Sequence, residues 1–275
     1  MTRPASESDL RRDLDARALW SVAHALADAA RPVTLTHFRS RALDIADKGA
    51  HGFDPVTQAD RDAEAAMRDV LHQLRPEDAI LGEEHGSKSG SSGLTWVLDP
   101  IDGTRAYVSG APTWGVLVAL KDINGPLLGI IDQPFIGERF AGGLGTAGAT
   151  GPMGLRNLAT RTTKSLAEAT LFTTFPEVGS PAERAGFAAV SDQVKLTRYG
   201  LDCYAYALLA AGQIDLVVEA GLQSYDICAP IAVIEAAGGI VTNWQGGSAA
   251  QGGRVIAAAN PEIHAAALSL LKQVP

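Results

Sequence analysis

Apolar residues near the start of the chain recur with a helical period. Between residues 14 and 30 they occupy positions 14, 18, 19, 22, 25, 26 and 29, which place them on one face of an amphipathic helix. Pro32 suits the first turn of a new helix, so we expect a second helix over residues 32–46. Residues 1–12 are polar and are expected to form a frayed lead-in.

A third helix is predicted after Thr57. Thr57 and Asp60 have the spacing of a capping box, and an apolar stripe follows over residues 63–74. Arg75-Pro76 ends this helix, because a residue that precedes proline avoids the helical conformation.

The pattern then changes to short apolar runs separated by Gly, Pro, Ser and Asp, which is typical of strands. The expected strands are residues 79–81, 96–98, 113–120 and 127–131. Helices followed by strands indicate an α+β arrangement for the first half.

Residues 142–154 contain six glycines and one proline, so we expect a hairpin or linker there. We place a boundary near Gly151, between an N-terminal half of residues 1–150 and a C-terminal half of residues 151–275. In the second half, strands and helices alternate as in a layered α/β domain. The expected strands are 170–174, 215–218, 240–242 and 255–258, and the expected helices are 182–190, 202–211, 226–237 and 261–272, the last capped by Asn260.

Composition is that of an ordinary globular protein. The chain has 275 residues, of which 46% are hydrophobic and 20% charged, and its formal net charge is −8. Such acidity argues against a nucleic-acid or membrane-surface partner. Two cysteines cannot form a disulfide framework or a four-cysteine zinc site. We find neither a signal peptide nor a spanning apolar segment, and therefore expect a cytoplasmic protein.

The segment Trp96-Val-Leu-Asp99-Pro-Ile-Asp102-Gly-Thr104 carries the most chemical information. Asp99 and Asp102 follow a buried strand, which we expect to end at Asp99, and the turn exposes the Ile101 carbonyl. Three oxygen ligands favour a hard cation such as Mg²⁺. Gly103 and Thr104 at a helix start would bind an anion. The alternative is an Asp-rich turn that binds no metal.

Two further acidic motifs support a metal site. Gly82-Glu83-Glu84 ends a predicted strand, where its charges would otherwise lie on the surface. Asp226 heads an apolar helix, where an acid also complements the helix dipole.

Together, Gly82-Glu83-Glu84, the Asp99–Thr104 hexapeptide, and Tyr225-Asp226 with Ala236-Ala-Gly-Gly239 downstream resemble the inositol monophosphatase superfamily. The resemblance implies an α/β fold, a five-layer αβαβα sandwich of the inositol monophosphatase/fructose-bisphosphatase type. It also implies a homodimer and two or three Mg²⁺ ions per site, between the two halves.

The resemblance assigns roles to matching residues. It implies metal ligation by Glu83, Asp99, the Ile101 carbonyl, Asp102 and Asp226, and phosphate contacts by Gly103 and Thr104. Asp60 matches the acid that orients Thr104 and helps hold a further metal. The implied reaction is hydrolysis of a phosphate monoester by in-line attack of water. Glu83 would orient the water, and Thr104 with Asp60 would relay its proton.

The substrate is suggested by the flanking residues. Arg105-Ala-Tyr107-Val-Ser109-Gly110 and Arg198-Tyr-Gly-Leu-Asp202-Cys-Tyr204 look most like histidinol-phosphate phosphatases of this superfamily, although a residue smaller than Leu201 is expected there.

Histidinol phosphate is a small phosphorylated metabolite with a cationic end. The carboxylates of Asp202 and Glu219 would bind that end, and Arg198 would help to bind the phosphate. The alternatives are a helix cap at Asp202, a surface charge at Glu219 and a solvated Arg198. Other possible functions are hydrolysis of inositol phosphate or another sugar phosphate, and a non-catalytic regulatory role.

Overall fold

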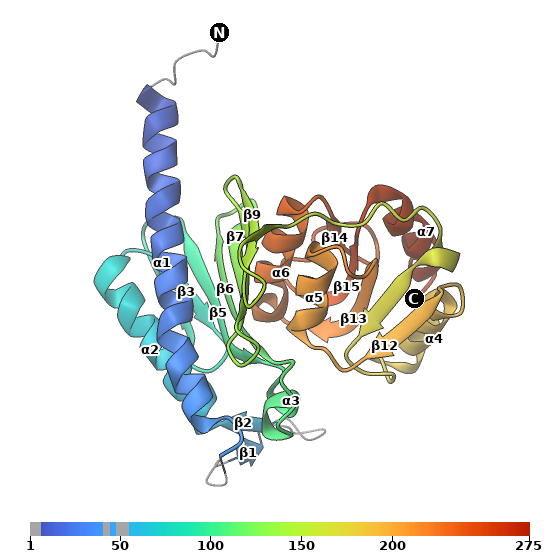
Figure 1. Ribbon diagram of the computed structural model, residues 1–275, viewed down its shortest axis with the longest axis horizontal. Helices are drawn as coiled ribbons and strands as arrows, with labels where there is room; N and C mark the ends of the chain where they lie inside the picture. Colours follow the sequence, from blue (N-terminus) through green and yellow to red (C-terminus); the bar gives the residue numbers. More distant parts are fainter. Residues whose placement is uncertain (1–6, 41–44, 48–54) are drawn as a thin grey trace.

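The computed structural model describes residues 7–40, 45–47 and 55–275, with side-chain surroundings for residues 16–40 and 57–275. Helices and sheets alternate in five layers (Figure 1). A pair of helices covers an eight-stranded sheet, a second pair separates it from a five-stranded sheet, and a third pair covers the outer face. The αβαβα sandwich expected from the sequence is confirmed.

The first layer consists of α1 (Glu7–His37) and α2 (Gln58–Leu74). The prediction of separate helices before and after Pro32 is wrong, because α1 continues through this proline. An internal proline costs a helix about 3 kcal/mol. Ala30 and Thr34, on either side of Pro32, are fully buried. Ala30 packs in the apolar cluster that α1 shares with the large sheet, and the Thr34 carbonyl accepts the Tyr107 hydroxyl at 2.6 Å, so packing on both sides holds the helix together.

The capping box predicted at the start of α2 is confirmed. The Thr57 hydroxyl accepts a hydrogen bond from the Ala59 amide at 3.1 Å, and the Asp60 carboxylate accepts one from the Thr57 amide at 2.8 Å. The cap fixes the first turn of α2. The apolar face of α2 contains Ala63, Met67 and Leu71, which are buried.

The large sheet has the strand order β10-β9-β8-β7-β6-β5-β3-β4. The strands are β3 (Ala79–Gly82), β4 (Gly86–Lys88), β5 (Thr95–Asp102), β6 (Gly115–Lys121), β7 (Pro126–Gln133), β8 (Glu138–Gly143), β9 (Thr146–Thr150) and β10 (Arg156–Asn157). Among the described strands of this sheet, β3 and β5 pair in parallel and the other neighbours are antiparallel. Strands β8 and β9 form a hairpin across the glycine-rich segment, and β10 continues the sheet past Gly151.

The second half contains the alternating elements that the sequence predicts. Its sheet has the order β12-β11-β13-β15-β14. The strands are β11 (Thr170–Thr173), β12 (Leu196–Tyr199), β13 (Leu216–Leu222), β14 (Ile240–Asn243) and β15 (Gly253–Ala258). The helices are α4 (Pro181–Ser191) and α7 (Pro261–Leu271) on the outer face and α5 (Cys203–Ala210) and α6 (Ser224–Ala236) between the sheets. Asn260 caps α7 through the Ile263 amide, as predicted.

Four short elements complete the described part of the chain. β1 (Ile45–Asp47) and β2 (Pro55–Thr57) form a two-stranded sheet, α3 (Thr104–Val108) follows β5, and η1 (Leu166–Glu168) precedes β11. No helix in the described part of the chain is long and apolar enough to cross a membrane.

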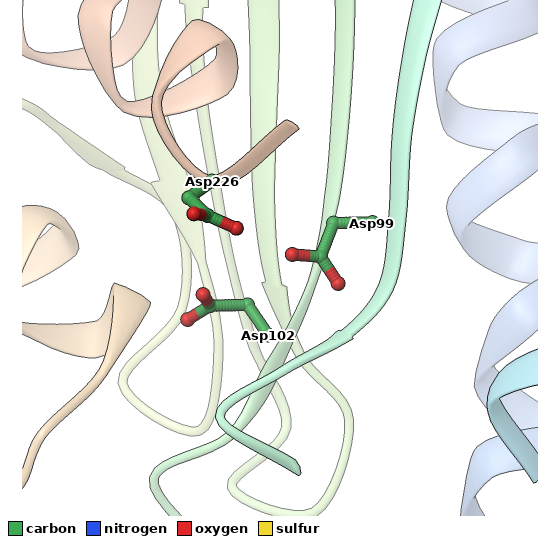
Figure 2. Close-up of side chains that lie close together, drawn as sticks. All are labelled: Asp99, Asp102 and Asp226. Atoms are coloured by element: carbon green, nitrogen blue, oxygen red, sulfur yellow. The ribbon is translucent and has the colours of Figure 1, made fainter. Parts of the chain in front are cut away.

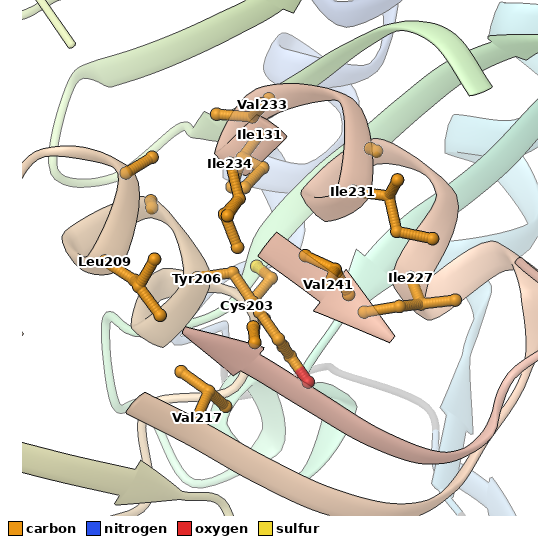
Figure 3. Close-up of a cluster of buried hydrophobic side chains, with 14 of the residues drawn as sticks. Ile131, Cys203, Tyr206, Leu209, Val217, Ile227, Ile231, Val233, Ile234 and Val241 are labelled. Carbon is orange, nitrogen blue, oxygen red and sulfur yellow. The ribbon is translucent and has the colours of Figure 1, made fainter. Parts of the chain in front are cut away.

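Helix α6 packs unusually close to the large sheet. A Cβ atom on Gly129 of β7 would lie 2.4 Å from the Ala229 carbonyl oxygen, and one on Gly142 of β8 would lie 2.4 Å from the Val233 Cα. The two glycines therefore let the helix backbone rest on the strands. Figure 3 shows the apolar cluster that α6 shares with α5 and the smaller sheet. This packing fixes the start of α6, where Asp226 lies.

Candidate active site

A bulge in β5 brings Asp99 and Asp102 to the same face. Asp99 pairs with Leu117 of β6, but Asp102 pairs with Gly115, so β5 has one extra residue in this stretch. Without it, residues three apart would point to opposite faces of the sheet. The prediction that the strand ends at Asp99 is wrong, because β5 continues to Asp102. The bulge accommodates Pro100, which cannot donate to a regular ladder.

A left-handed glycine turns the chain from β5 into α3. Gly103 has a φ of +87°, and a Cβ there would lie 2.7 Å from the Asp202 carboxyl carbon. Only glycine meets both conditions without strain. Thr104 begins α3, and its hydroxyl donates to the Ile101 carbonyl at 3.2 Å. The predicted helix start and the Ile101 carbonyl thus lie side by side.

Asp226 approaches these acids from the other half of the chain. One carboxylate oxygen from each of Asp99, Asp102 and Asp226 lies within 4.8 Å of the others (Figure 2). The Asp226 carboxylate also accepts the Gln223 amide at 2.6 Å, at the first turn of α6. The acid therefore both caps the helix and joins the cluster.

Burial and mutual repulsion shift the acids of this cluster toward the protonated form. Burial, with the neighbouring charges of Glu83, Asp102 and Asp226, raises the pKa of Asp99 well above its usual range. Burial raises the pKa of Asp102 in the same way, and Asp226 adds to the effect. Burial raises the pKa of Asp226 to about 6. Such a group of acids is stabilised by a cation.

Glu83 lies in the turn between β3 and β4. Its backbone amide donates to the Leu98 carbonyl at 3.2 Å, which ties the turn to β5 just before Asp99. The charge of Glu83 contributes to the raised pKa of Asp99, so the two carboxylates are close. The structure thus brings Glu83 beside the three aspartates.

Asp60 lies in the first turn of α2 and is fully buried. One carboxylate oxygen accepts from the Thr57 amide and hydroxyl, while Oδ1 is buried without a hydrogen-bond partner in the described structure. Burial raises the pKa of Asp60 to about 6. In the described part of the chain no hydrogen bond joins Asp60 to Thr104, whose hydroxyl is directed to Ile101.

A cavity of about 390 Å³ opens beside the acid cluster. Its lining brings together Glu83, Asp102, Gly103, Thr104, Asp202, Glu219 and Asp226 from the predicted site. Arg105 also lines it, with its guanidinium 4.9 Å from the centre of the Phe175 ring. The cavity therefore joins the metal-ligand candidates to the residues expected to select the substrate.

Asp202 points into this cavity rather than capping α5. Its backbone has a φ of +46°, which is rare outside glycine, and its side chain makes no cap hydrogen bond. Instead its carboxylate accepts the Thr113 hydroxyl at 3.2 Å. Burial raises the pKa of Asp202, and Thr113 and the charge of Arg105 oppose the rise. Strained backbone of this kind is concentrated at functional sites.

Glu219 is buried on β13 rather than exposed at a strand end. Its Oε1 atom accepts from the Thr174 amide at 2.7 Å and from the Thr174 hydroxyl at 2.9 Å. Burial raises the pKa of Glu219 to about 7, although these two hydrogen bonds oppose the shift. A carboxyl group that titrates near neutrality is thus held in the cavity wall.

Four predicted site residues do not line the cavity: Asp60, Asp99, Ile101 and Arg198. Asp99 still belongs to the acid cluster, whereas Arg198 has no contact with the cavity or the cluster in the described part of the chain. It is exposed on β12, which is the edge strand of the smaller sheet, and does not line the cavity.

Sequence reasoning missed several residues around the site. Thr174 and Tyr206 line the cavity, and the Tyr206 hydroxyl is buried with no hydrogen-bond partner in the described structure. Glu64 is fully buried beneath the Glu83 turn. The sequence could have indicated Glu64, because it follows Asp60 by four residues on the same face of a helix. No sequence pattern pointed to Thr174 or Tyr206.

Comparison with known proteins decides the family. The model of the Inositol monophosphatase family matches residues 15–275. This chain belongs to that family. Its members are phosphatases, and the acid cluster found here is one that could bind the metal on which they depend.

Individual relatives of the family differ in their names. The chain is 42% identical over 263 residues to the bifunctional phosphatase IMPL2 of Arabidopsis thaliana, covering 92% of this chain and 74% of that protein. It is 34% identical to a histidinol-phosphatase of Mycobacterium tuberculosis, covering 85% and 91%.

Among solved structures, an inositol monophosphatase from Zymomonas mobilis is 39% identical with a TM-score of 0.80, covering 98% of this chain and 100% of that one. The chain is thus a member of this family, and the names of its relatives refer to more than one substrate.

Proposed function

We propose that this protein is a Mg²⁺-dependent phosphatase of small phosphate monoesters and that its substrate is histidinol phosphate. The observation that carries the proposal is the single cavity shared by the acid cluster, Gly103-Thr104, Asp202 and Glu219. The acid cluster and Gly103-Thr104 suit a metal-bridged phosphate, and the same cavity presents the carboxylates of Asp202 and Glu219 to a cation.

The acid cluster fits Mg²⁺ by its chemistry. All its candidate ligands are oxygens, from Glu83, Asp99, Asp102, Asp226 and the Ile101 carbonyl, and hard cations prefer such ligands. Burial and mutual repulsion raise the pKa values of Asp99 and Asp102, and a bound cation would relieve that repulsion. When bound, two or three Mg²⁺ ions would neutralise the phosphate and assist water attack at phosphorus.

The protein side of the reaction is assigned to four residues. The backbone of Gly103 and Thr104, with the Thr104 hydroxyl, would hold the phosphate at the start of α3. Glu83 would orient the attacking water. Asp60 Oδ1, which has no partner in the described structure, would receive the proton through the Thr104 hydroxyl once that hydroxyl turns away from the Ile101 carbonyl. A pKa of about 6 leaves Asp60 able to accept a proton near neutrality.

The carboxylates of Asp202 and Glu219 in the cavity wall favour a substrate with positive charge. Histidinol phosphate carries an ammonium group and an imidazole ring, both hydrogen-bond donors when charged. Asp202 is fixed by Thr113, and Glu219 by Thr174, so both carboxylates are held ready for such donors. Inositol offers only neutral hydroxyls, for which two buried acids give no added charge complementarity.

A substrate panel tests the proposal. Phosphate release is measured from histidinol phosphate and from inositol 1-phosphate, with Mg²⁺ and with a chelator. We expect a higher kcat/KM for histidinol phosphate, and no release with the chelator. Equal or better turnover of inositol 1-phosphate would overturn the substrate assignment, and release that persists in the chelator would overturn the metal assignment.

Inositol phosphate or another sugar phosphate remains the second candidate, favoured by the likeness to the Zymomonas mobilis inositol monophosphatase. If no panel member is hydrolysed with Mg²⁺, a non-catalytic regulatory role becomes the better explanation. We also propose a homodimer, which light scattering during gel filtration tests; a monomer mass would refute it.

A further inference from the structure

The carboxylate of Glu64 lies directly beneath the turn that carries Glu83. Its Oε2 atom accepts the Glu84 amide at 2.7 Å, and its Oε1 atom accepts the His85 amide at 3.2 Å. Glu64 is fully buried on α2. Both residues after Glu83 are therefore fastened to the helix by hydrogen bonds to a charged acceptor, which are stronger than neutral ones.

Gly82 leaves the space that this carboxylate occupies. A Cβ atom at Gly82 would lie 2.0 Å from the Glu64 Oε1 atom and 2.4 Å from its carboxyl carbon. Any other residue at the end of β3 would displace Glu64. The glycine before Glu83 is thus explained by the buried carboxylate behind it.

Arg68 completes the arrangement one helical turn along α2. Its Nε atom donates to Glu64 Oε1 at 2.7 Å, and its Nη2 atom donates to the Gly86 carbonyl. The pair Glu64 and Arg68, called here the α2 clamp, therefore contacts the turn at positions 84, 85 and 86. Asp60 lies four residues before Glu64 on the same helix face. Helix α2 therefore carries Asp60 itself and also holds the turn that carries Glu83.

We propose that Glu64 is a positioning residue of the metal site, and that the α2 clamp holds Glu83 in the geometry needed to bind a divalent cation. The inference rests on the metal-dependent function proposed above. Residues behind the direct ligands set ligand orientation, and their loss typically lowers metal affinity by about 10- to 100-fold. Glu64 acts through the backbone of the turn and touches neither substrate nor metal.

Direct binding of Mn²⁺, followed by electron paramagnetic resonance, tests the proposal without any measurement of activity. In Glu64→Gln one acceptor oxygen becomes an amide that faces N–H groups, so the turn loses its anchor while the volume is kept. We expect at least one Mn²⁺ site of the variant to bind about 10-fold more weakly than in wild type. Glu64→Asp retains the charge and should recover part of that affinity.

Asp78 provides a matched control at the opposite end of β3. It is also buried, and its carboxylate accepts from Arg75 and from the Trp96 indole. Asp78→Asn should lower the unfolding temperature as a lost buried ion pair does, but leave Mn²⁺ affinity unchanged. A purely structural role for Glu64 predicts instead that both variants behave alike.

Should Glu64→Gln fail to fold, Arg68→Met serves as the second variant, because it removes the bond to the Gly86 carbonyl from a partly exposed position. A folded Glu64→Gln or Arg68→Met variant with wild-type Mn²⁺ affinity would overturn the inference. Wild-type protein that binds no Mn²⁺ would instead refute the proposed metal site, so the two failures are distinguishable.

Discussion

Glu219 and Thr174 form a two-bond contact in the cavity wall. Both the amide and the hydroxyl of Thr174 donate to one oxygen of the Glu219 carboxylate, Oε1, so neither bond uses Oε2. The two residues come from different segments of the smaller sheet region, 45 positions apart in the chain. The contact orients a carboxyl group whose pKa burial raises to about 7.

The charge of Glu219 should make recognition of a cationic substrate depend on pH. Above pH 7 the carboxylate is ionised, and on acidification to pH 5.5 it becomes neutral. We therefore expect the KM for histidinol phosphate to rise several-fold between pH 7.5 and 5.5 in the wild-type protein. Steady-state kinetics with saturating Mg²⁺ at fixed ionic strength measures this rise.

Glu219→Gln separates this effect from titration of the substrate itself. Ionisation of the phosphate and imidazole affects both proteins equally, so the variant should have a high KM that changes much less with pH. The KM for inositol 1-phosphate should respond similarly in both proteins. Identical pH profiles of KM for histidinol phosphate in the two proteins would refute a charge role for Glu219.

Removal of one acid should stabilise the metal-free protein. A raised pKa means that the folded protein binds the Asp99 proton more tightly than the unfolded chain does. Stability is therefore lost as pH rises above the ordinary carboxyl range. Asp99→Asn removes this loss, so with chelator at pH 8 we expect its unfolding free energy to exceed that of wild type.

The same substitution should reverse the order of stability when Mg²⁺ is added. Ligand binding stabilises a folded protein only if its binding site is intact. Millimolar Mg²⁺ should therefore raise the melting temperature of wild type and scarcely change that of Asp99→Asn. Phosphatase activity of the variant should fall by at least two orders of magnitude. Equal Mg²⁺ stabilisation of the two proteins, measured by calorimetry, would show that Asp99 is not a metal ligand.

Local rules predicted the framework of the site better than its details. The capping box at Thr57 and Asp60 and the helix headed by Asp226 depend on neighbouring residues only, and the structure has both. The contacts of Glu219 with Thr174 and of Glu64 with Glu84 join residues distant in the chain. No local spacing encodes such pairs, so sequence analysis placed Glu219 but missed its partner.

Two errors came from proline, whose local preference was outweighed by packing. Pro32 was expected to begin a helix and Pro100 to end a strand, yet α1 and β5 both continue. At Pro32, buried neighbours on both sides of the residue hold the helix together. At Pro100, an extra residue in β5 removes the proline from the regular ladder.

Pro32 should therefore lower the stability of the native protein. In Pro32→Ala the amide of residue 32 can donate to the carbonyl of Asp28, four residues earlier. We expect the unfolding free energy to increase by about 1–2 kcal/mol, after allowing for the greater freedom of the unfolded chain. Pro261→Ala is the control, because Pro261 occupies the first turn of α7, where no such bond is lost. An equal change in both variants in urea denaturation would argue against this explanation.

The close approach of Gly103 to Asp202 predicts a loss of function beyond simple backbone strain. Gly103 and Gly93 have similar positive φ angles, +87° and +83°, but a Cβ at Gly93 meets nothing within 4 Å. Gly93→Ala and Gly103→Ala should each lose about 1 kcal/mol of stability from the φ angle. Only Gly103→Ala should displace the Asp202 carboxylate, 2.7 Å from the new methyl group, and lower kcat/KM by about 10-fold or more. Comparable kcat/KM values for the two variants would mean that the approach of these residues has no part in catalysis.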